Sequence, residues 1–482
     1  MSSQIDFSVS ADLTLQAIRD GKLPVHAYIS EVLDLCKREE NRNTFISLLD
    51  EPALKAANGL DELQSEGSTL APLAGLAVAI KDNINVVGVP TTAGTASLTN
   101  NISTTTAPTA QKLIDAGAIV IGKTNLHELA LGTTGINTAE CAGLVQNPRA
   151  PGKTPGGSSS GTAAAIAAGL VTCGLGTDTG GSVRIPAALT GTVGLRPSVG
   201  DGGAERRYHD DGQVVPLSRT RDTVGPMGRS VAEVALLDSV ITGSKRVTNP
   251  TSLSGVRMGI PPILWSGLDK SLEKVVLKAV ETLTQAGVVF VDDDLPDIFT
   301  LGDQISSSIL MRETEEDISN YLKISGVRDL SFKDMTERIT SPDVKPIFES
   351  IVAGTAHDTY DEVMTKHRPS FQQIYKNYFS RNNINALLFP TTILPATSIE
   401  AIQRLGTVSI NDGPPCDAFH AYKRNTSPTS IAGLPGLSVP CGYTEDRLPV
   451  GIELDGLVGS DEALLGLGLA LEQAFNVEQP AH

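Results

Sequence analysis

The hydrophobic and polar positions of this 482-residue chain divide it into three stretches. From Ser10 to about Gly67, apolar residues recur at the spacing of an amphipathic helix. The pattern breaks at residues 21–24 and again before Asn41, where one helix is expected to end and the next to begin. Residues 1–69 are therefore predicted to form an N-terminal helical segment.

The remaining chain, residues 70–482, is predicted to form one larger domain in which strands and helices alternate. Short apolar runs at 74–80 and 118–121 predict strands, and residues 109–116 between them predict a helix. Residues 163–168 predict a further helix. Alternation of this kind indicates an α/β fold, in which helices cover a central sheet.

A more charged stretch lies between about residues 249 and 384. Its helical spacing is clearest at 270–287 and 344–379, so it predicts a helical lobe within the larger domain. Strand character returns at 386–390 and at 437–440, where proline stands at the strand ends.

The charge and cysteine content narrow the setting. The chain has 38 Lys and Arg against 55 Asp and Glu, a net charge of −17, which repels phosphate groups and acidic lipid. Neither nucleic acid nor a membrane is expected as a partner. The five cysteines form no CxxC pair, there is no signal-peptide pattern, and the apolar runs are too short to span a bilayer. A cytoplasmic protein is expected.

Two glycine-rich loops, residues 154–161 and 176–186, carry the candidate chemistry. Each places a serine, Ser158 or Ser182, directly after a Gly-Gly pair. Glycine lets the backbone approach a ligand closely and adopt conformations that a side chain would forbid. The loops therefore predict a site where main-chain N–H groups and hydroxyls meet on one small group.

Other glycine-rich and metal-binding motifs fit less well. A P-loop requires Lys and then Ser or Thr after its last glycine, whereas Gly161 is followed by Thr and Ala. Residues 157–161 match a Gly-x-Ser-x-Gly nucleophile elbow, but the three prolines in 147–155 exclude the strand that should precede it. His127 and Glu128 begin like a zinc-binding HExxH helix, but Leu131 replaces the second histidine, so neither a metal nor a cofactor is expected.

Taken together, the two loops resemble the amidase signature family. Its central pattern is matched at residues 156–161, 178–186 and 194–197. Shorter segments also resemble family motifs: 80–83, 122–128, 433–440 and 448–453. The resemblance covers roughly residues 70 to 475. It implies a single amidase-signature fold with a mixed, mostly parallel β-sheet covered by helices on both faces.

The resemblance implies a Ser-Ser-Lys catalytic triad. Ser182 would be the nucleophile, Ser158 would carry its proton onward, and Lys81 would be the base. The family resemblance also implies that the Gly157–Ser158 peptide bond is cis. A lysine accepts a proton only when it is neutral, and its ordinary pKa is near 10.4. Lys81 follows an apolar run, so burial is expected to lower its pKa.

Three further groups are implied around this triad. Consecutive backbone N–H groups of the second loop would stabilise the oxyanion: Thr179, Gly180, Gly181 and Ser182. Supporting residues are expected beside the loops, the last two as a bracing ion pair: Ser159, Asp178 and Arg184. A substrate-binding turn is expected after the His-Glu segment: Gly132, Thr133 and Thr134.

The expected function is hydrolysis of a small primary amide to a carboxylic acid and ammonia through a serine acyl-enzyme. Residues 208–226 resemble the indoleacetamide and mandelamide hydrolases of this family, which favours an aryl or alkyl acyl group. Three alternatives stay open: the glutamine-hydrolysing component of a glutamine-dependent amidotransferase, an amidase for a urea-type, anilide or other specialised substrate, and a non-catalytic binding protein. A small-molecule amide is the expected partner, and a homodimer stays open.

Overall fold

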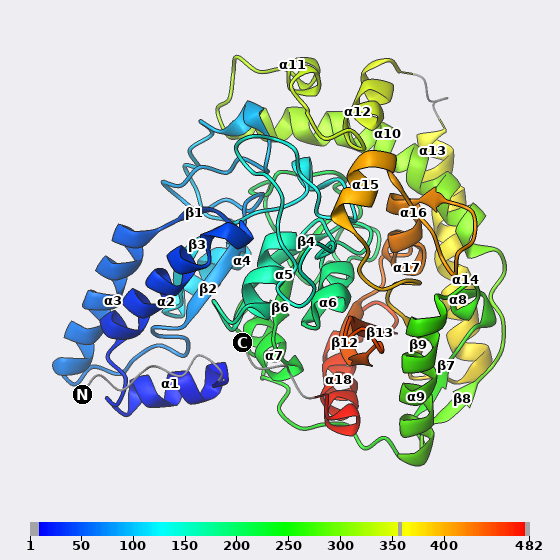
Figure 1. Cartoon of the computed structure of the whole chain (residues 1–482), viewed down its shortest axis with the longest axis horizontal. Helices are drawn as coiled ribbons and strands as arrows, with labels where there is room; N and C mark the ends of the chain where they lie inside the picture. Colours follow the sequence, from blue (N-terminus) through cyan, green and yellow to red (C-terminus); the bar gives the residue numbers. More distant parts are fainter. Residues whose placement is uncertain (1–8, 355–358, 478–482) are drawn as a thin grey trace.

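An 11-stranded mixed β-sheet runs through the part of the chain that the computed structural model describes, residues 9–354 and 359–477 (Figure 1). Its strand order is β1-β3-β2-β4-β6-β5-β12-β13-β9-β7-β8. Parallel pairs join β3, β2 and β4 near one end and β9, β7 and β8 at the other, while antiparallel pairs join the strands between β4 and β9. The strands are β1 (Phe45–Leu48), β2 (Ala77–Lys81), β3 (Ile119–Thr124), β4 (Cys173–Asp178), β5 (Val193–Arg196), β6 (Thr223–Gly228), β7 (Arg257–Gly259), β8 (Val289–Val291), β9 (Ala386–Pro390), β12 (Gly436–Tyr443) and β13 (Pro449–Asp455).

Strand β2 shows how the sheet separates two apolar layers. Val78 and Ile80 pack with residues of α4 (Pro108–Asp115) and α7 (Val231–Thr242) on one face. Ala77 and Ala79 pack on the other face with α2 (Val25–Arg38) and α5 (Ser160–Ala167). Successive side chains of a strand point to opposite faces, so a continuous apolar run suits a strand that is buried on both. The predicted α/β fold with helices on both faces is confirmed.

The N-terminal stretch is helical, as its spacing predicted, with one addition. It contains α1 (Ala11–Arg19), α2 and α3 (Asp50–Ser65), but residues 45–48 form β1, which pairs antiparallel with β3 at the edge of the sheet. Four residues are too few for their period to separate a strand from a helix. Because β1 extends the main sheet, this stretch is packed onto the rest of the fold. A domain boundary at residue 69 stays a prediction.

The stretch 249–384 is less uniformly helical than its spacing predicted. Its first part supplies β7 and β8 to the sheet, with α9 (Lys270–Gln285) between them in the sequence. The helices of the lobe follow from residue 298, and α11 and α12 lie at the top of the view in Figure 1. They are α10 (Ile298–Ile324), α11 (Phe332–Glu337), α12 (Lys345–Val352), α13 (Tyr360–Glu362) and α14 (Arg368–Asn382).

The remaining elements are short or lie near the C-terminal end of the sequence. A separate two-stranded sheet pairs β10 (Thr407–Val408) with β11 (Cys416–Asp417). The other α-helices are α6 (Arg184–Thr190), α8 (Pro262–Trp265), α15 (Ile399–Leu405), α16 (Ala418–Lys423), α17 (Thr426–Ile431) and α18 (Asp461–Phe475). Short 3-10 turns occupy Glu40–Arg42, Ala96–Leu98 and Glu128–Ala130, and a π-helical turn precedes α14 at Val363–His367.

Both serine loops meet one edge of this sheet. Strands β2 and β4 are parallel neighbours, so Lys81 and Asp178, their last residues, lie at the same edge. Helix α5 begins directly after Ser159, and α6 begins two residues after Ser182. Ligands of open α/β sheets bind outside the carboxyl ends of the parallel strands, which is where these loops lie.

Candidate active site

Lys81 is a fully buried lysine at the end of β2. Its Nζ donates to the Oγ of Ser158 over 2.7 Å and to the Oγ1 of Thr177 over 2.7 Å. Burial lowers the pKa of Lys81 to about 7, although the carboxylates of Asp178 and Asp222 favour the charged form. At neutral pH, Lys81 can therefore either give a proton to its neighbours or accept one.

The first serine loop is held by backbone hydrogen bonds. The Gly157–Ser158 peptide is cis, as the sequence led us to expect. The N–H of Gly157 donates to the carbonyl of Thr133 over 2.8 Å, and the N–H of His127 donates to the carbonyl of Ser158 over 3.1 Å. The loop is thereby fixed against the segment that follows β3, with the Ser158 hydroxyl facing Lys81.

Ser159 links the two serine loops to β4. Its hydroxyl donates to the carbonyl of Thr177 over 3.2 Å and accepts from the Thr177 N–H over 3.3 Å. Its backbone N–H donates to the carbonyl of Ser182 over 3.1 Å. The structure thus places Ser182 beside the first loop, but in the part of the chain that it describes no hydrogen bond joins the hydroxyls of Ser158 and Ser182.

Ser182 borders a small cavity, whereas Lys81 and Ser158 lie behind it. Ser182 is 8% exposed, and the other two are completely buried. The cavity has a volume of about 40 Å³, enough for a few water molecules. Gly132 and Thr133 line this cavity, but Thr134 does not. The carbonyl of Thr134 instead accepts a hydrogen bond from the hydroxyl of Thr154.

The second serine loop presents free backbone N–H groups to this cavity. Thr179, Gly180 and Ser182 all line it, and their N–H groups find no acceptor within the described residues. Gly181 differs, because its N–H donates to the Oδ1 of Asp178 over 3.0 Å. Gly181 also has a φ of +127°, and a Cβ added there would collide with Thr426. Three of the four predicted donors are therefore available to a ligand oxygen, and Gly181 shapes the loop.

A buried ion pair spans the second loop. Arg184 contacts Asp178 over 3.1 Å, and Arg196 contacts the same carboxylate over 3.0 Å. Burial opposes ionisation of Asp178, but the guanidinium groups of Arg184 and Arg196 hold the pKa of this carboxyl well below its usual range. The Asp178 carboxylate also accepts the N–H of Val183 over 3.1 Å, so it ties both ends of the loop. This geometry suits the bracing role that the sequence suggested.

Several residues of this site were not predicted from the sequence. Arg184 also contacts Glu453 of β13, whose pKa is raised well above its usual value by burial and by the neighbouring Asp455. Asn83 donates to the hydroxyl of Thr177 over 3.2 Å. Thr177 could have been found from its position, since it precedes Asp178 on a strand parallel to β2. Nothing near Arg184 in the sequence points to Glu453, 269 residues away.

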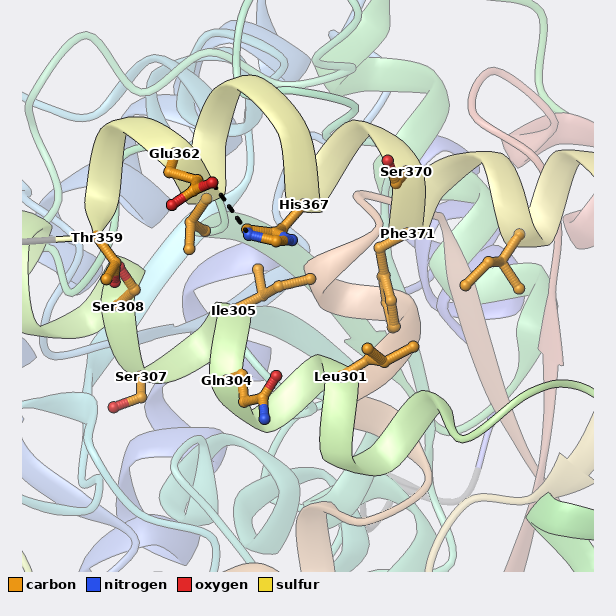
Figure 2. Close-up of a pocket in the computed structure, with 12 residues that line it drawn as sticks. Leu301, Gln304, Ile305, Ser307, Ser308, Thr359, Glu362, His367, Ser370 and Phe371 are labelled. Atoms are coloured by element: carbon orange, nitrogen blue, oxygen red, sulfur yellow. Dashed lines mark hydrogen bonds and ion pairs between the residues drawn. The ribbon is translucent and has the colours of Figure 1, made fainter.

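A larger cavity of about 620 Å³ lies elsewhere, between α10 and the segment from α13 to α14 (Figure 2). Leu301, Ile305 and Phe371 form its apolar floor, and Glu362 and His367 point toward one another across 4.0 Å. Neither Lys81 nor the two serine loops line it. It is therefore not a candidate for the chemistry that these residues suggest.

Neither a metal cluster nor a membrane-spanning helix is found in the described ranges. No group of three or more His, Cys, Asp and Glu side chains there could hold a metal ion. No helix in those ranges is both long and apolar enough to cross a bilayer. The five cysteines are free thiols, and Cys416 alone among them is exposed.

Comparison with known proteins identifies the class. The family model described as Amidase matches residues 27–465, so the chain belongs to the amidase family, and it is an amidase that acts on linear amides. The family resemblance in the sequence motifs is confirmed.

Relatives of known activity lie within this family. The chain is 40% identical over 418 residues to an indoleacetamide hydrolase from Agrobacterium vitis, covering 86% of each protein. It is 38% identical over 466 residues to a mandelamide hydrolase from Pseudomonas putida, covering 93% of this chain and 87% of the relative. One component of the glutamyl-tRNA(Gln) amidotransferase from Symbiobacterium thermophilum is 34% identical over 89% of each chain.

Solved structures agree with this assignment. The native peptide amidase from Stenotrophomonas maltophilia superimposes with a TM-score of 0.83 at 26% identity, covering 99% of each chain. The fold is therefore shared along almost the whole length of the two proteins.

Proposed function

We propose that this amidase hydrolyses a small primary amide with an aryl or alkyl acyl group, through an acyl-enzyme on Ser182. One observation carries the proposal: the Nζ of a fully buried Lys81 lies 2.7 Å from the Oγ of Ser158, directly behind the cavity that Ser182 borders. A neutral lysine in this position is a base for a serine hydroxyl. A purely structural lysine would not need a serine loop with unpaired N–H groups beside it.

The proposed first half-reaction forms the acyl-enzyme. Ser182 Oγ attacks the amide carbonyl carbon, its proton passes to Ser158, and the Ser158 proton passes to Lys81. The C–N bond then breaks, and the same path returns a proton to the nitrogen, so that ammonia leaves. This route requires the hydroxyls of Ser158 and Ser182 to form a hydrogen bond when substrate is bound, and such contacts commonly tighten in the substrate complex.

The second half-reaction releases the acid. Water attacks the acyl carbonyl carbon and gives its proton to Ser158 and Lys81, and the ester bond to Ser182 breaks as its oxygen regains a proton. In both steps the negatively charged oxygen of the tetrahedral intermediate would accept hydrogen bonds from the free N–H groups of Thr179, Gly180 and Ser182. Loss of one such donor typically costs about 3 kcal/mol of transition-state stabilisation.

The preference for an aryl or alkyl group is supported by the cavity wall and by the relatives. Leu217, Leu310 and Phe419 supply apolar surface to the cavity. Each buried CH₂ of a substrate contributes about 0.8 kcal/mol of binding free energy. The cavity is small, about 40 Å³, so a bound aryl group would contact these wall side chains directly.

Ammonia release by the purified chain alone tests the proposal. Phenylacetamide should be hydrolysed with a higher kcat/KM than glutamine. The opposite order would favour the amidotransferase component, although a net charge of −17 gives little attraction for tRNA. Faster turnover of an anilide or a urea-type amide would favour a specialised amidase, and failure with every amide would favour a binding protein.

The cellular setting is part of the proposal. We place the enzyme in the cytoplasm, because its five free cysteines suit a reducing compartment. No residue contact supports the homodimer, which stays a prediction that light scattering would check.

A further inference from the structure

Arg221 is a buried cation on the wall of the Ser182 cavity. It is 2% exposed, and its Nη1 donates to the Oγ of Ser306 over 2.7 Å. Burial, with Arg196 and Arg368 nearby, lowers its pKa to about 10, so it is charged at neutral pH. The carboxylates of Asp222 and Glu313 favour its charged form, but neither forms an ion pair with its guanidinium in the described ranges, and its buried Nε has no hydrogen-bond partner.

Ser427 is a second unpartnered polar group on the same wall. Its side chain is buried, and its Oγ makes no hydrogen bond within the described residues. Arg221 and Ser427 both face Gly180, since a Cβ built on that glycine would lie 3.5 Å from Nη2 of Arg221 and 3.9 Å from Oγ of Ser427. Nη2 of Arg221 and the hydroxyl of Ser427 therefore flank Gly180, whose N–H group has no acceptor within the described residues.

Burying such groups without partners is unfavourable. A buried donor left unsatisfied loses the hydrogen bonds it made to water, and an unpaired charge loses more. The nearby Lys423 shows the contrast, because it lies 3.7 Å from Asp303 and over the ring of Phe419 at 4.7 Å. Arg221 also contacts α10 through Ser306, but this hydrogen bond uses only one of the five N–H groups of its guanidinium.

We propose that Arg221 and Ser427 form a binding subsite for an oxygen acceptor on the acyl half of the substrate. The acceptor is a hydroxyl or a carboxylate on the carbon next to the scissile carbonyl. Arg221 donates to it through Nη2 and Ser427 through its hydroxyl, while the aryl or alkyl part contacts the apolar wall. This inference rests on the proposed amidase reaction at Ser182 and specifies which amides that reaction prefers.

Three matched amides test the subsite: phenylacetamide, mandelamide with an added α-hydroxyl, and phenylmalonic acid monoamide with an added α-carboxylate. The wild-type enzyme should hydrolyse one of the oxygen-bearing amides with a kcat/KM about 10-fold or more above that of phenylacetamide, since a charged hydrogen bond is worth this much. The better of the two identifies the acceptor as hydroxyl or carboxylate.

Two variants should remove this preference. Arg221→Met should bring the ratio of the oxygen-bearing amide to phenylacetamide close to one, because kcat/KM should fall more for the oxygen-bearing amide than for phenylacetamide. Ser427→Ala should lower the same ratio by a smaller factor and keeps the test open if Arg221→Met fails to fold by circular dichroism. Arg219→Met is the matched control and should keep the wild-type ratio, because Arg219 is exposed and already paired with Asp317.

Two results would overturn the subsite: a wild-type enzyme with no preference among the three amides, or variants that lower kcat/KM for all three by the same factor. Both leave the proposed function standing if phenylacetamide is still hydrolysed. If no amide is hydrolysed by the wild-type enzyme, the proposed function fails, and the subsite fails with it.

Discussion

The hydroxyl of Thr177 lies 2.7 Å from the Nζ of Lys81, the same distance as the hydroxyl of Ser158. Asn83 fixes the same hydroxyl from 3.2 Å, and all of these side chains are buried. Lys81 is therefore oriented by two hydroxyl groups as well as by its backbone, and the geometry of the proposed base depends on a threonine that carries no chemistry of its own.

Replacing this threonine should weaken catalysis without affecting binding. Thr177→Val keeps the shape of the side chain and removes the hydroxyl, so Lys81 loses one of its two hydroxyl acceptors. Lys81 then keeps the Ser158 hydroxyl and, over 3.5 Å, the Thr177 carbonyl. We expect kcat to fall by about 10-fold, with KM unchanged, because a misplaced base acts on the transition state. Thr109→Val is the control, since the buried hydroxyl of Thr109 has no partner within the described residues, and its kinetics should match the wild type.

The pH dependence should report the state of Lys81. Below about pH 7 the ammonium form dominates and cannot accept a proton, and above that pH the neutral amine can. The kcat/KM of the wild-type enzyme should therefore rise with pH through an apparent pKa of about 7 and then level off. Lys81→Met should abolish turnover, and a variant with wild-type rates would show that this lysine is not the base.

Ser182→Ala should remove the covalent step and leave the fold intact. We expect kcat to fall by at least about a thousandfold, because the free N–H groups alone support only residual catalysis. Steady-state kinetics with phenylacetamide and thermal unfolding provide the measurements. A variant that retains a larger share of the activity would assign the nucleophile to another group.

An acyl-enzyme should be trapped without any metal. Hydroxylamine attacks the acyl group on Ser182 in place of water, so the wild-type enzyme should produce a hydroxamate from phenylacetamide and Ser182→Ala should not. Prolonged treatment with EDTA should leave the rate unchanged. Loss of activity on chelation, with no hydroxamate formed, would contradict the mechanism.

The two neighbouring glycines of the second loop should respond differently to alanine. Gly181 has a positive φ and packs against Thr426, so Gly181→Ala should lower the free energy of unfolding by about 2 kcal/mol or more. Gly180 lacks a positive φ, and a Cβ there meets only ordinary contacts, so Gly180→Ala should fold normally. Its methyl group should instead lower kcat/KM by about 10-fold by filling the cavity. Urea unfolding and kinetics separate the two effects.

The sequence predicted the fold where the pattern was long. The apolar run before Lys81 and the run 386–390 became β2 and β9, because continuous apolar residues suit strands buried on both faces. Strands β7 and β8 were missed, since each has three residues within a charged, helical stretch. Such short strands are defined by pairing with β9 and with each other rather than by their own composition.

The candidate site could be predicted in its two loops and at Lys81, the last residue of β2. Gly-Gly-Ser motifs identify Ser158 and Ser182 because the glycines are visible in the sequence. Arg196 and Glu453 lie in segments that resemble family motifs, but the motifs do not say which residues they contact, since their partners are brought to them by the order of the strands. The hydrogen bond from the Gly181 N–H to the Asp178 carboxylate depends on the conformation of the turn, so residue spacing could not predict it.

The contact between Arg184 and Glu453 also has a consequence for biosynthesis. Arg184 follows the second serine loop directly, whereas Glu453 lies on β13, the last strand of the described chain to be translated. While a ribosome is still making that strand, Arg184 lacks one of its two buried carboxylate partners, and the loop beside it has no complete support. An unfinished polypeptide would therefore not hydrolyse amides, and the active enzyme would arise only when the late-emerging strand docks against a sheet begun some 400 residues earlier.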